Sequence, residues 1–535
     1  MNLAFDPWIP CLRRDGTFCL ASLCQCLTDS DIVDLAVRPH ERVALMRLLL
    51  CVAYAAVGIP RDYTEWKGCR ERLPGAVPPY LEQWRDSFAL FHPQKPFLQV
   101  AGLKSAAKPG KKKEVDAGEG GDDGPTSTAK LDFALASGNN STLFDHEARN
   151  PRRAASPEKL ALDLLTFQMF SPGGLIGSIV WQGQERSRTS SDAPCIPGSM
   201  LHTFVRGADL PETVWRNLLA ADRLHAFASL GDGWQGRPLW ERFPQGPQDV
   251  DAVHNATRTF LGRMVPLSRA VRLQADGVSM LLGNGLDYPS FSNAKNPFPE
   301  EPSATVVLRK GKKDASERAL LGVQPGKAIW RQLHALVVQR DAEGVGCCPA
   351  LARVNAVVDK AVDIVVAGVA RDQANIIDVV ESVFHVPAPL LREDGHDLYA
   401  EEVRLAEETE QYALASAVER WRVSVDGGWQ ARLKLAGGKK YTECAKLRAQ
   451  ASRDYWTAVE GNLSLLWEVV AALDTDASAD KQRRWHELLR DSALNAYTTA
   501  CRGSGERQLR AFVAGRRELF RKMYKILELP QKEDK

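Results

Sequence analysis

Three adjacent ionisable residues in the first third of the chain have the side chains needed for acid–base chemistry or metal binding. They are Asp145, His146 and Glu147. Side chains of neighbouring loop residues diverge, whereas a metal site needs three or four convergent ligands. We therefore predict neither catalysis nor metal binding at this triplet.

Catalytic signatures are missing from the rest of the sequence. It contains no Walker A motif, no glycine-rich dinucleotide fingerprint, no His-Glu-x-x-His pair and no Gly-x-Ser-x-Gly elbow. The 11 cysteines form no paired Cys-x-x-Cys frame, and the ten histidines form no closely spaced pair. We expect a protein that is not an enzyme and that holds no metal or other cofactor.

A glycine-rich stretch offers a different kind of site. Gly173, Gly174 and Gly177 follow a predicted helix at about 158–170, which Ser156 caps. Such glycines either end the helix in a turn or let the backbone approach a ligand closely, because glycine has no Cβ. A backbone of this kind can enter the minor groove of DNA, where readout depends on groove width and on donors and acceptors.

Clusters of basic residues are candidates for contacts with phosphate groups. The alternative is that they are solvated surface charges. The whole chain has 69 basic and 67 acidic residues, so nucleic-acid binding would have to use local patches rather than an overall field. The candidates are Arg149, Arg152, Arg153, Lys159, Arg309, Lys310, Lys312 and Lys313.

These residues must be positioned by a protein that we predict to be α+β. The chain has 535 residues, of which 44% are hydrophobic, and this allows a large core. We expect a mixed α/β domain over residues 1–388 and a four-helix bundle over 389–535. The boundary follows Pro387 and Pro389, beyond which apolar residues recur at helical spacing. Further helices are expected at about 440–473, 479–501 and 506–527.

Within the first domain, local patterns predict several elements and one loop. We expect a buried helix at 40–57, which is too short to span a membrane and is flanked by Asp34 and Arg42 as ordinary surface charges. A second helix is expected at 78–91. The lysine-rich and then glycine-rich stretch at about 104–130 has the composition of a disordered loop.

Strands and a hairpin are expected later in the same domain. Strands are predicted at 305–309 and 362–369, and a strand and a helix within 199–222. A hairpin is predicted to turn within Gly368–Gln373, with Gln373 at its tip. The reduced cysteines and the N-terminal sequence, which does not resemble an export signal, favour a cytoplasmic protein without a membrane segment.

Taken together, these motifs resemble the large subunit of the type I-E CRISPR Cascade complex, the CasA family. The opening MNLAFDPWIP is similar to the start of that family, and Thr203–Gly207 to a T-F-V-R-G signature. Residues 137–146 resemble its loop L1, Pro172-Gly173-Gly174 its glycine loop, and Gly368–Asn375 its wedge hairpin. The helical C-terminus resembles its four-helix bundle.

The resemblance implies a non-enzymatic subunit of an RNA-guided surveillance complex in antiviral defence. Such a subunit binds target double-stranded DNA, recognises the protospacer-adjacent motif (PAM), begins strand separation and helps to recruit a helicase–nuclease. Its partners would be the other Cascade subunits and the crRNA. In such effectors, the protein generally reads a short flanking motif, and base pairing with the guide reads the rest of the target.

The resemblance also implies which residues contact nucleic acid. For DNA or the PAM these are Gly173, Gly174, Gly177, Asp372, Gln373 and Ala374, with Lys295 as the nearest candidate for the family's PAM-contacting lysine. For loop L1 they are Asn139, Asn140, Phe144, Asp145 and His146.

Two departures and two alternatives accompany this prediction, and the first departure is that the family's PAM-contacting lysine has no clean match here. Some relatives hold zinc with two cysteine pairs, but residues 149–160 and 270–290 contain no cysteine, so a zinc site is not carried over. A metal-dependent nuclease would need a His/Asn/His constellation, usually with cysteine pairs, and the sequence has neither. The remaining alternative is a non-catalytic structural or RNA-binding scaffold of a CRISPR complex.

Overall fold

The structure is a computed structural model in which the chain folds as two compact units. The first comprises Met1–Leu336, Arg340–Val357 and Val362–His385, and the second comprises Val337–Gln339, Val358–Ala361 and Val386–Lys535. The structure describes residues 1–106, 125–133, 154–171, 176–186, 193–196, 199–224, 233–290, 301–310, 316–355, 360–372, 375–427 and 439–528. The mixed α+β class predicted from the sequence is confirmed.

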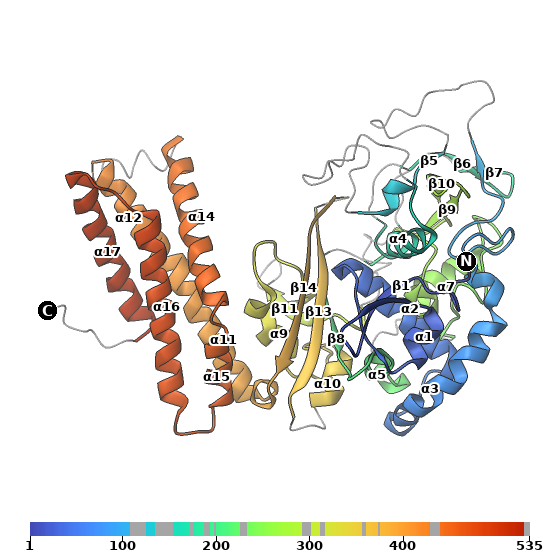
Figure 1. Cartoon of the computed structure of the whole chain (residues 1–535), viewed down its shortest axis with the longest axis horizontal. Coiled ribbons are helices and arrows are strands. Elements are labelled where there is room, and N and C mark those ends of the chain that lie inside the picture. The colour runs from blue at the N-terminus through green and yellow to red at the C-terminus, as the bar shows by residue number, and fades with distance from the viewer. Residues whose placement is uncertain are drawn as a thin grey trace. The chain divides into compact units, whose positions relative to one another are not determined.

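The first unit is built around helix α2, Pro39–Val57, which is shown in Figure 1. Proline at the first helical position favours the start of the helix, which ends before Gly58. Residues 40–54 are all buried, as expected for a helix with apolar side chains on every face. The predicted buried helix at 40–57 is therefore confirmed. Among the described residues, no helix is both long and apolar enough to cross a membrane.

The helix predicted at 78–91 is wrong in its bounds. Helix α3 covers Tyr63–Gln83, and a short 3₁₀ helix, η1, follows at Arg85–Phe88. Asp62 caps α3 by accepting hydrogen bonds from the backbone N–H groups of Thr64 and Glu65. Buried residues recur at helical spacing from Trp66 onward, so burial against the rest of the unit extends the helix through three internal prolines.

The described residues of this unit also form five small sheets. Their strand orders are β2-β1-β3, β5-β10-β9, β11-β12, β14-β13-β8 and β4-β6-β7. The strands are β1 Ile9–Arg13, β2 Phe18–Ala21, β3 Ile32–Leu35, β4 Lys104–Ser105, β5 Thr126–Ser127, β6 Ile179–Trp181, β7 Gln184–Arg186, β8 Leu201–Val205, β9 Arg269–Leu273, β10 Ser279–Asn284, β11 Val306–Lys310, β12 Ser316–Leu320, β13 Val362–Asp372 and β14 Asn375–Val386.

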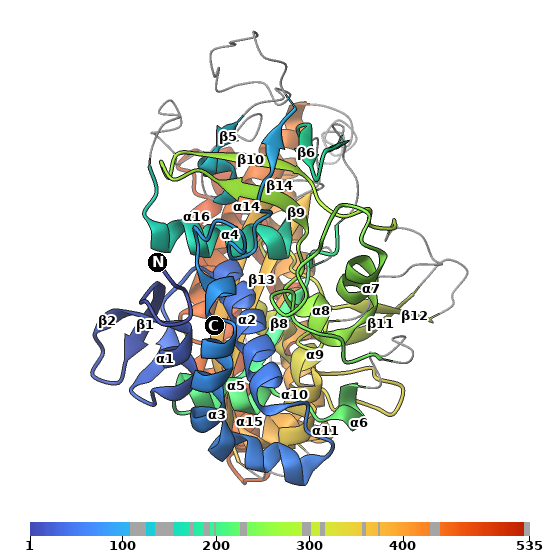
Figure 2. The same ribbon diagram turned by 90° about the vertical axis from the view of Figure 1, so that its right-hand side faces the viewer.

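Shorter helices complete the part of the chain before residue 386. They are α1 Leu23–Thr28, η2 Thr128–Leu131, α4 Pro157–Phe170, α5 Leu210–Asn217, α6 Ala221–Leu224, α7 Val250–Arg258, α8 Phe260–Met264, η5 Ile329–Gln332, α9 Leu333–Val337 and α10 Pro349–Asn355. Figure 2 shows α4 lying next to the sheet that contains β9 and β10. The strand and helix predicted within 199–222 are confirmed as β8 and α5.

The loop predicted at about 104–130 is wrong at both ends. Lys104 and Ser105 pair with β6, whereas Thr126 and Ser127 pair with β10. Beyond them, Leu131 is buried in η2. Composition did not predict these short elements because their hydrogen-bond partners come from distant strands. Residues 107–124 lie outside the described residues.

Strand β13 approaches its neighbour β8 so closely that one position requires glycine. Gly368 pairs with Leu201, and a Cβ at residue 368 would lie 2.6 Å from the carbonyl oxygen of Met200. It would also lie 2.6 Å from a methyl carbon of Val323. Contacts this short force the backbone to shift.

We expect Gly368→Ala to destabilise the protein by about 1–3 kcal/mol because the strands must separate. The measurement is the midpoint of thermal unfolding of the isolated chain. Gly68→Ala is the matched control, since a Cβ there has no neighbour within 4 Å and alanine favours helix α3. Equal midpoints for the two variants would contradict this account of Gly368.

The described residues of the second unit between 388 and 526 form helices joined by short turns, with no strand among them. A long helix contains α11 Glu393–Glu408, a π-helical turn η7 Thr409–Leu414 and α12 Ala415–Val425, after the short η6 Ala388–Leu391. The others are α14 Lys439–Glu460, α15 Ser464–Ala471, α16 Ser478–Ala500 and α17 Glu506–Ile526. The stretch predicted as one helix at 440–473 is therefore two.

These helices pack as a bundle, drawn in orange and red in Figure 1. The hydroxyl of Tyr455 in α14 donates to the carbonyl of Ala406 in α11, 3.0 Å away. The hydroxyl of Tyr497 in α16 donates to the carbonyl of Phe512 in α17 at 2.8 Å. Buried tyrosines thus satisfy their polar ends on the backbone of a neighbouring helix.

Candidate nucleic-acid interface

Most residues predicted to contact nucleic acid fall outside the described residues. These are Asn139, Asn140, Phe144, Asp145, His146, Arg149, Arg152, Arg153, Gly173, Gly174, Lys295, Lys312, Lys313, Gln373 and Ala374. Of the others, Gly177 is half-buried before β6, Lys310 is exposed at the end of β11, and Asp372 ends the backbone of β13. The described residues show how the chain is held on either side of the predicted loops.

Helix α4 connects two of the predicted loops. Its N-terminus follows residues 134–153, and Ser156 caps it by accepting a hydrogen bond from the backbone N–H of Lys159 at 3.3 Å. Its C-terminus leads through Ser171 into residues 172–175. The helix has 14 residues and is therefore about 20 Å long. The helix predicted at about 158–170 is confirmed.

A buried glutamine holds α4 against strand β9. The side-chain nitrogen of Gln168 donates to the carbonyls of Leu98 and Arg269, at 3.2 and 2.9 Å. Its side-chain oxygen accepts from the backbone N–H of Arg269 at 2.9 Å. Because every polar atom of this amide is bonded, its burial fixes the position of α4 without leaving an unsatisfied group.

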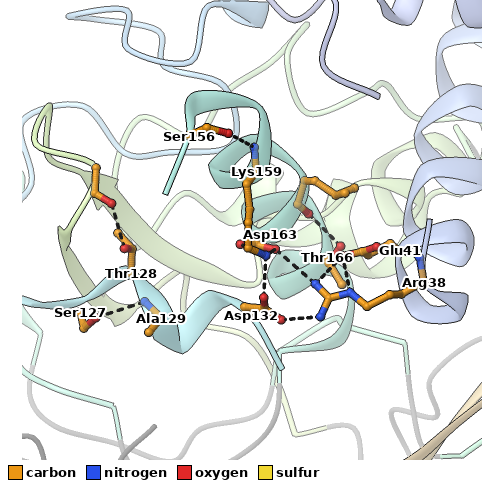
Figure 3. A network of polar contacts seen from close by, with 12 residues as sticks. Arg38, Glu41, Ser127, Thr128, Ala129, Asp132, Ser156, Lys159, Asp163 and Thr166 are labelled. Carbon is orange, nitrogen blue, oxygen red and sulfur yellow. Dashed lines mark hydrogen bonds and ion pairs between the residues drawn. The ribbon is translucent and has the colours of Figure 1, made fainter. Parts of the chain in front are cut away.

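A network of charged residues lies at the N-terminal end of α4, where the predicted loop L1 meets the core. Figure 3 shows Arg38, Asp132, Lys159 and Asp163 pointing toward one another. Lys159 Nζ lies 2.5 Å from Asp132 and 3.0 Å from Asp163. Arg38 contacts Asp132 at 2.8 Å and Glu41 at 2.6 Å. The network joins the chain just before residues 134–153 to the helix just after them.

This network gives Lys159, a candidate for phosphate contact in the sequence, two carboxylate partners within the protein. Both of its carboxylate partners are buried, and their attraction outweighs the effect of burial and raises the pKa of Lys159. An ammonium that pairs with two buried acidic side chains contributes to holding this end of α4 in place. The sequence could not show this, because Asp132 and Lys159 are separated by the whole of residues 134–153.

Asp163 makes the same network sensitive to pH. Burial, together with repulsion by Asp132, raises the pKa of Asp163 from 3.8 to about 7. The folded protein therefore binds this proton more tightly than the unfolded chain. The stabilising effect of the proton is fully present below about pH 4 and is lost as the pH rises to about 7. His40 next to it has its pKa lowered to about 4 by burial and stays neutral over most of this range.

We expect the Asp163→Asn variant to gain stability relative to the wild type as the pH rises from 4 to 7, because asparagine cannot ionise. The measurement is the midpoint of thermal unfolding of both proteins across this range. The exposed Asp222 provides the control variant, Asp222→Asn, whose pH profile should follow the wild type. Parallel profiles for the wild type and Asp163→Asn would show that Asp163 titrates at its ordinary pKa.

Strands β13 and β14 form the predicted hairpin. They are neighbours in one sheet and are separated only by Gln373 and Ala374, which lie outside the described residues. β13 extends to Asp372, so the strand is longer than the predicted 362–369. The hairpin itself is confirmed, but the turn predicted within Gly368–Gln373 is wrong, because residues 368–372 still belong to β13.

The base of this hairpin is attached to helix α2 through a buried arginine. Arg42 Nε donates to Glu381 of β14 at 2.7 Å, and its Nη1 donates to Asp34 at 2.5 Å. The prediction that Asp34 and Arg42 are ordinary surface charges is wrong for Arg42, which is only 6% exposed. Its partner Glu381 lies 339 residues away in the sequence, so no local pattern could have indicated the pair.

The tip of the hairpin and the predicted glycine loop start from residues that are in contact. The guanidinium of Arg371 in β13 donates to the carbonyl oxygen of Phe170, the last residue of α4. Its Cζ lies 5.5 Å from the centre of the Phe170 ring. The backbone N–H of Arg371 donates to the Ser199 hydroxyl at 2.7 Å. The structure therefore brings the chain entering residues 172–175 next to the chain entering residues 373–374.

Lys310, by contrast, lies on a separate two-stranded sheet. It pairs with Ser316 at the end of the β11–β12 ladder and is exposed. Within the described ranges, no group of three or more His, Cys, Asp or Glu side chains is arranged to hold a metal ion.

Comparisons with known proteins agree with the resemblance. The family model for CRISPR-associated protein Cse1 matches residues 2–496. The CRISPR-associated protein CasA/Cse1 of Thermus thermophilus is 28% identical over 548 residues, which cover 97% of this chain and 96% of that protein.

Solved structures share the fold. Thermobifida fusca Cse1 matches with a TM-score of 0.75 at 21% identity, covering 99% of both chains. A chain of a CRISPR RNA-guided surveillance complex matches with a TM-score of 0.63 at 17% identity, covering 97% of this chain and 99% of that one. The chain therefore belongs to the Cse1 (CasA) family, the large subunits of the type I-E CRISPR Cascade complex.

Proposed function

We propose that this Cascade subunit recognises the PAM in target double-stranded DNA, opens the first base pairs and helps to recruit the helicase–nuclease. It acts in the cytoplasm together with the other Cascade subunits and the crRNA, and it is not itself an enzyme. The residues proposed to act on DNA are those of the glycine loop at 172–177 and of the hairpin tip at 372–374.

The contact between Arg371 and Phe170 is the observation that carries this proposal. A protein that opens DNA beside a PAM needs its reading element and its opening element close together, because the first pairs to open adjoin the motif. The glycine loop and the hairpin tip are far apart in sequence, yet the residues that lead into them touch. Opening each step costs about 1.4 kcal/mol of stacking, which contacts from the tip would partly offset while guide pairing restores the rest.

The charged network at the start of α4 supports a role for loop L1. Asp132 and Lys159 hold together the two ends of the stretch that contains Phe144. Closing a loop at its base limits the positions that its residues can adopt. We propose that Phe144, with Asn139 and Asn140, stacks on or contacts the first guide–target pairs, since aromatic side chains stack readily on unpaired bases.

The test compares complete Cascade with Cascade lacking only this subunit, on duplexes with and without a PAM. We expect the complete complex to prefer the PAM duplex and the incomplete complex to lose that preference. Helicase–nuclease capture on the bound complexes then measures recruitment. If both complexes show the same ratio of affinities for the two duplexes, the subunit is the structural or RNA-binding scaffold instead.

A further inference from the structure

Three cysteine thiols gather where the sheet of β1, β2 and β3 meets helix α1. Cys11 of β1 and Cys26 of α1 are fully buried, and their sulfur atoms lie 3.7 Å apart. Cys19 of β2 lies directly opposite Cys11 in the ladder between β1 and β2. Burial, followed by the neighbouring thiols of Cys11 and Cys19, raises the pKa of Cys26. The function proposed above gives this cluster no role.

The three thiols differ in how easily solvent reaches them. β2 is an edge strand of its sheet, and Cys19 on it is half-buried. Its neighbours Phe18 and Leu20, whose side chains alternate with it, are 80% and 47% exposed. A small oxidant can therefore reach Cys19 at the open edge of the sheet. Cys11 and Cys26 are closed off from solvent, and buried thiols of this kind are unreactive by themselves.

The spacing of the cluster is compatible with disulfide bonds. Residues directly opposite in an antiparallel ladder, as Cys11 and Cys19 are, have Cα atoms about 4.5–5.5 Å apart, which is within the range for a disulfide. The sulfur atoms of Cys11 and Cys26 would have to close from 3.7 Å to the bond length of about 2 Å. Rotation of the two side chains between staggered conformations can supply a movement of this size.

We propose that Cys11, Cys19 and Cys26 form a thiol-oxidation site, which reacts with hydrogen peroxide and ends with a disulfide between β1 and α1. In the reducing cytoplasm proposed for this chain, the three cysteines are thiols at rest. Disulfides that form in that compartment are usually transient and redox-sensing. This inference does not depend on the role proposed in DNA binding.

The reaction balances in three steps. The ionised Cys19 sulfur attacks a peroxide oxygen, the O–O bond breaks, and the departing hydroxide takes a proton and leaves as water, so that Cys19 becomes a sulfenic acid. The Cys11 sulfur then attacks the Cys19 sulfur, and the hydroxyl group leaves as water with the Cys11 proton. The Cys26 sulfur finally attacks the Cys11 sulfur, and Cys19 leaves as a thiol with the Cys26 proton. Two thiols are oxidised, and one peroxide is reduced to two waters.

Hydrogen peroxide added to the reduced, purified full chain tests the proposal. The remaining thiols are alkylated, and the chain is digested without reduction. Cleavage after Arg13 and Arg14 separates Cys11 from Cys19 and Cys26. We expect mass spectrometry to find a cross-link between Cys11 and Cys26, assigned by fragmentation, that disappears after reduction with dithiothreitol.

Single variants test the order of the steps. Cys19→Ser should form the link between Cys11 and Cys26 about tenfold more slowly, since only thiols closed off from solvent remain. Cys26→Ser should instead accumulate a link between Cys11 and Cys19. Cys24→Ser is the matched control, because Cys24 is also half-buried and belongs to the same helix α1, and it should form the link at the native rate.

Three results would overturn the proposal. In the first, peroxide oxidises the half-buried Cys195 while Cys11 and Cys26 stay unlinked in the native chain. In the second, the link forms only in urea and therefore needs the unfolded chain. In the third, Cys19→Ser forms the link as fast as the native chain does, which removes Cys19 from the site. If Cys26→Ser fails to fold, Cys26→Ala takes its place, because alanine buries no hydroxyl group.

Discussion

Cascade assembled with Gly174→Asp is expected to lose PAM-dependent DNA binding while the complex still forms. In the proposed function the backbone at this position approaches the minor groove, which is only about 6 Å wide, and a side chain would occupy that space. The added carboxylate would also be repelled by the closely spaced phosphates. Losing discrimination worth about 1–3 kcal/mol corresponds to about 5- to 150-fold weaker binding of the PAM duplex.

The measurement is a titration of complexes with PAM and PAM-free duplexes, with size-exclusion chromatography to check assembly. Gly75→Asp places the same charge at an exposed position of α3 where a Cβ meets no atom within 4 Å. It should bind both duplexes as the wild type does. An equal loss on both duplexes for Gly174→Asp would mean that the loop serves general affinity or folding.

Glu301→Ala is expected to destabilise the protein by about 3–5 kcal/mol, the usual consequence of removing one partner from a buried ion pair. Glu301 forms an ion pair with Arg47 of α2 and lies 3.7 Å from Arg263 of α8, and the three side chains are 8% exposed or less. Burial opposes ionisation of Glu301, but Arg47 and Arg263 outweigh it and hold its pKa below the ordinary value. Without Glu301, both arginines would remain buried with less compensation.

Urea denaturation of the isolated chain measures this effect. The control is Glu506→Ala, which removes the partner of Arg510 in a pair that is about 80% exposed on α17. Exposed pairs of this kind contribute about 0–1 kcal/mol, so the control should unfold nearly as the wild type does. A comparable loss for both variants would contradict the importance assigned to Glu301.

Elements with a strong local signal were predictable from the sequence. Helix α2 has apolar residues on every face, α4 has a serine cap and a proline at its first position, and the helical period after Pro389 continues through α11 and α12. Helix α3 was mispredicted because it contains Pro74, Pro78 and Pro79, which disfavour a helix locally. Its burial against the rest of the unit stabilises the helix despite these prolines.

The α+β class and the resemblance to the Cse1 family could be predicted from the chain alone, because helical periods, caps and short ordered motifs are local features. Which charges meet depends instead on how distant segments fold together. Arg42 pairs with Glu381 across 339 residues, Arg47 with Glu301 across 254, and Arg371 reaches Phe170 across 201. A sequence does not distinguish surface charges from buried ones. A buried charge is stabilised by a partner, and folding brings that partner close from a distant part of the chain.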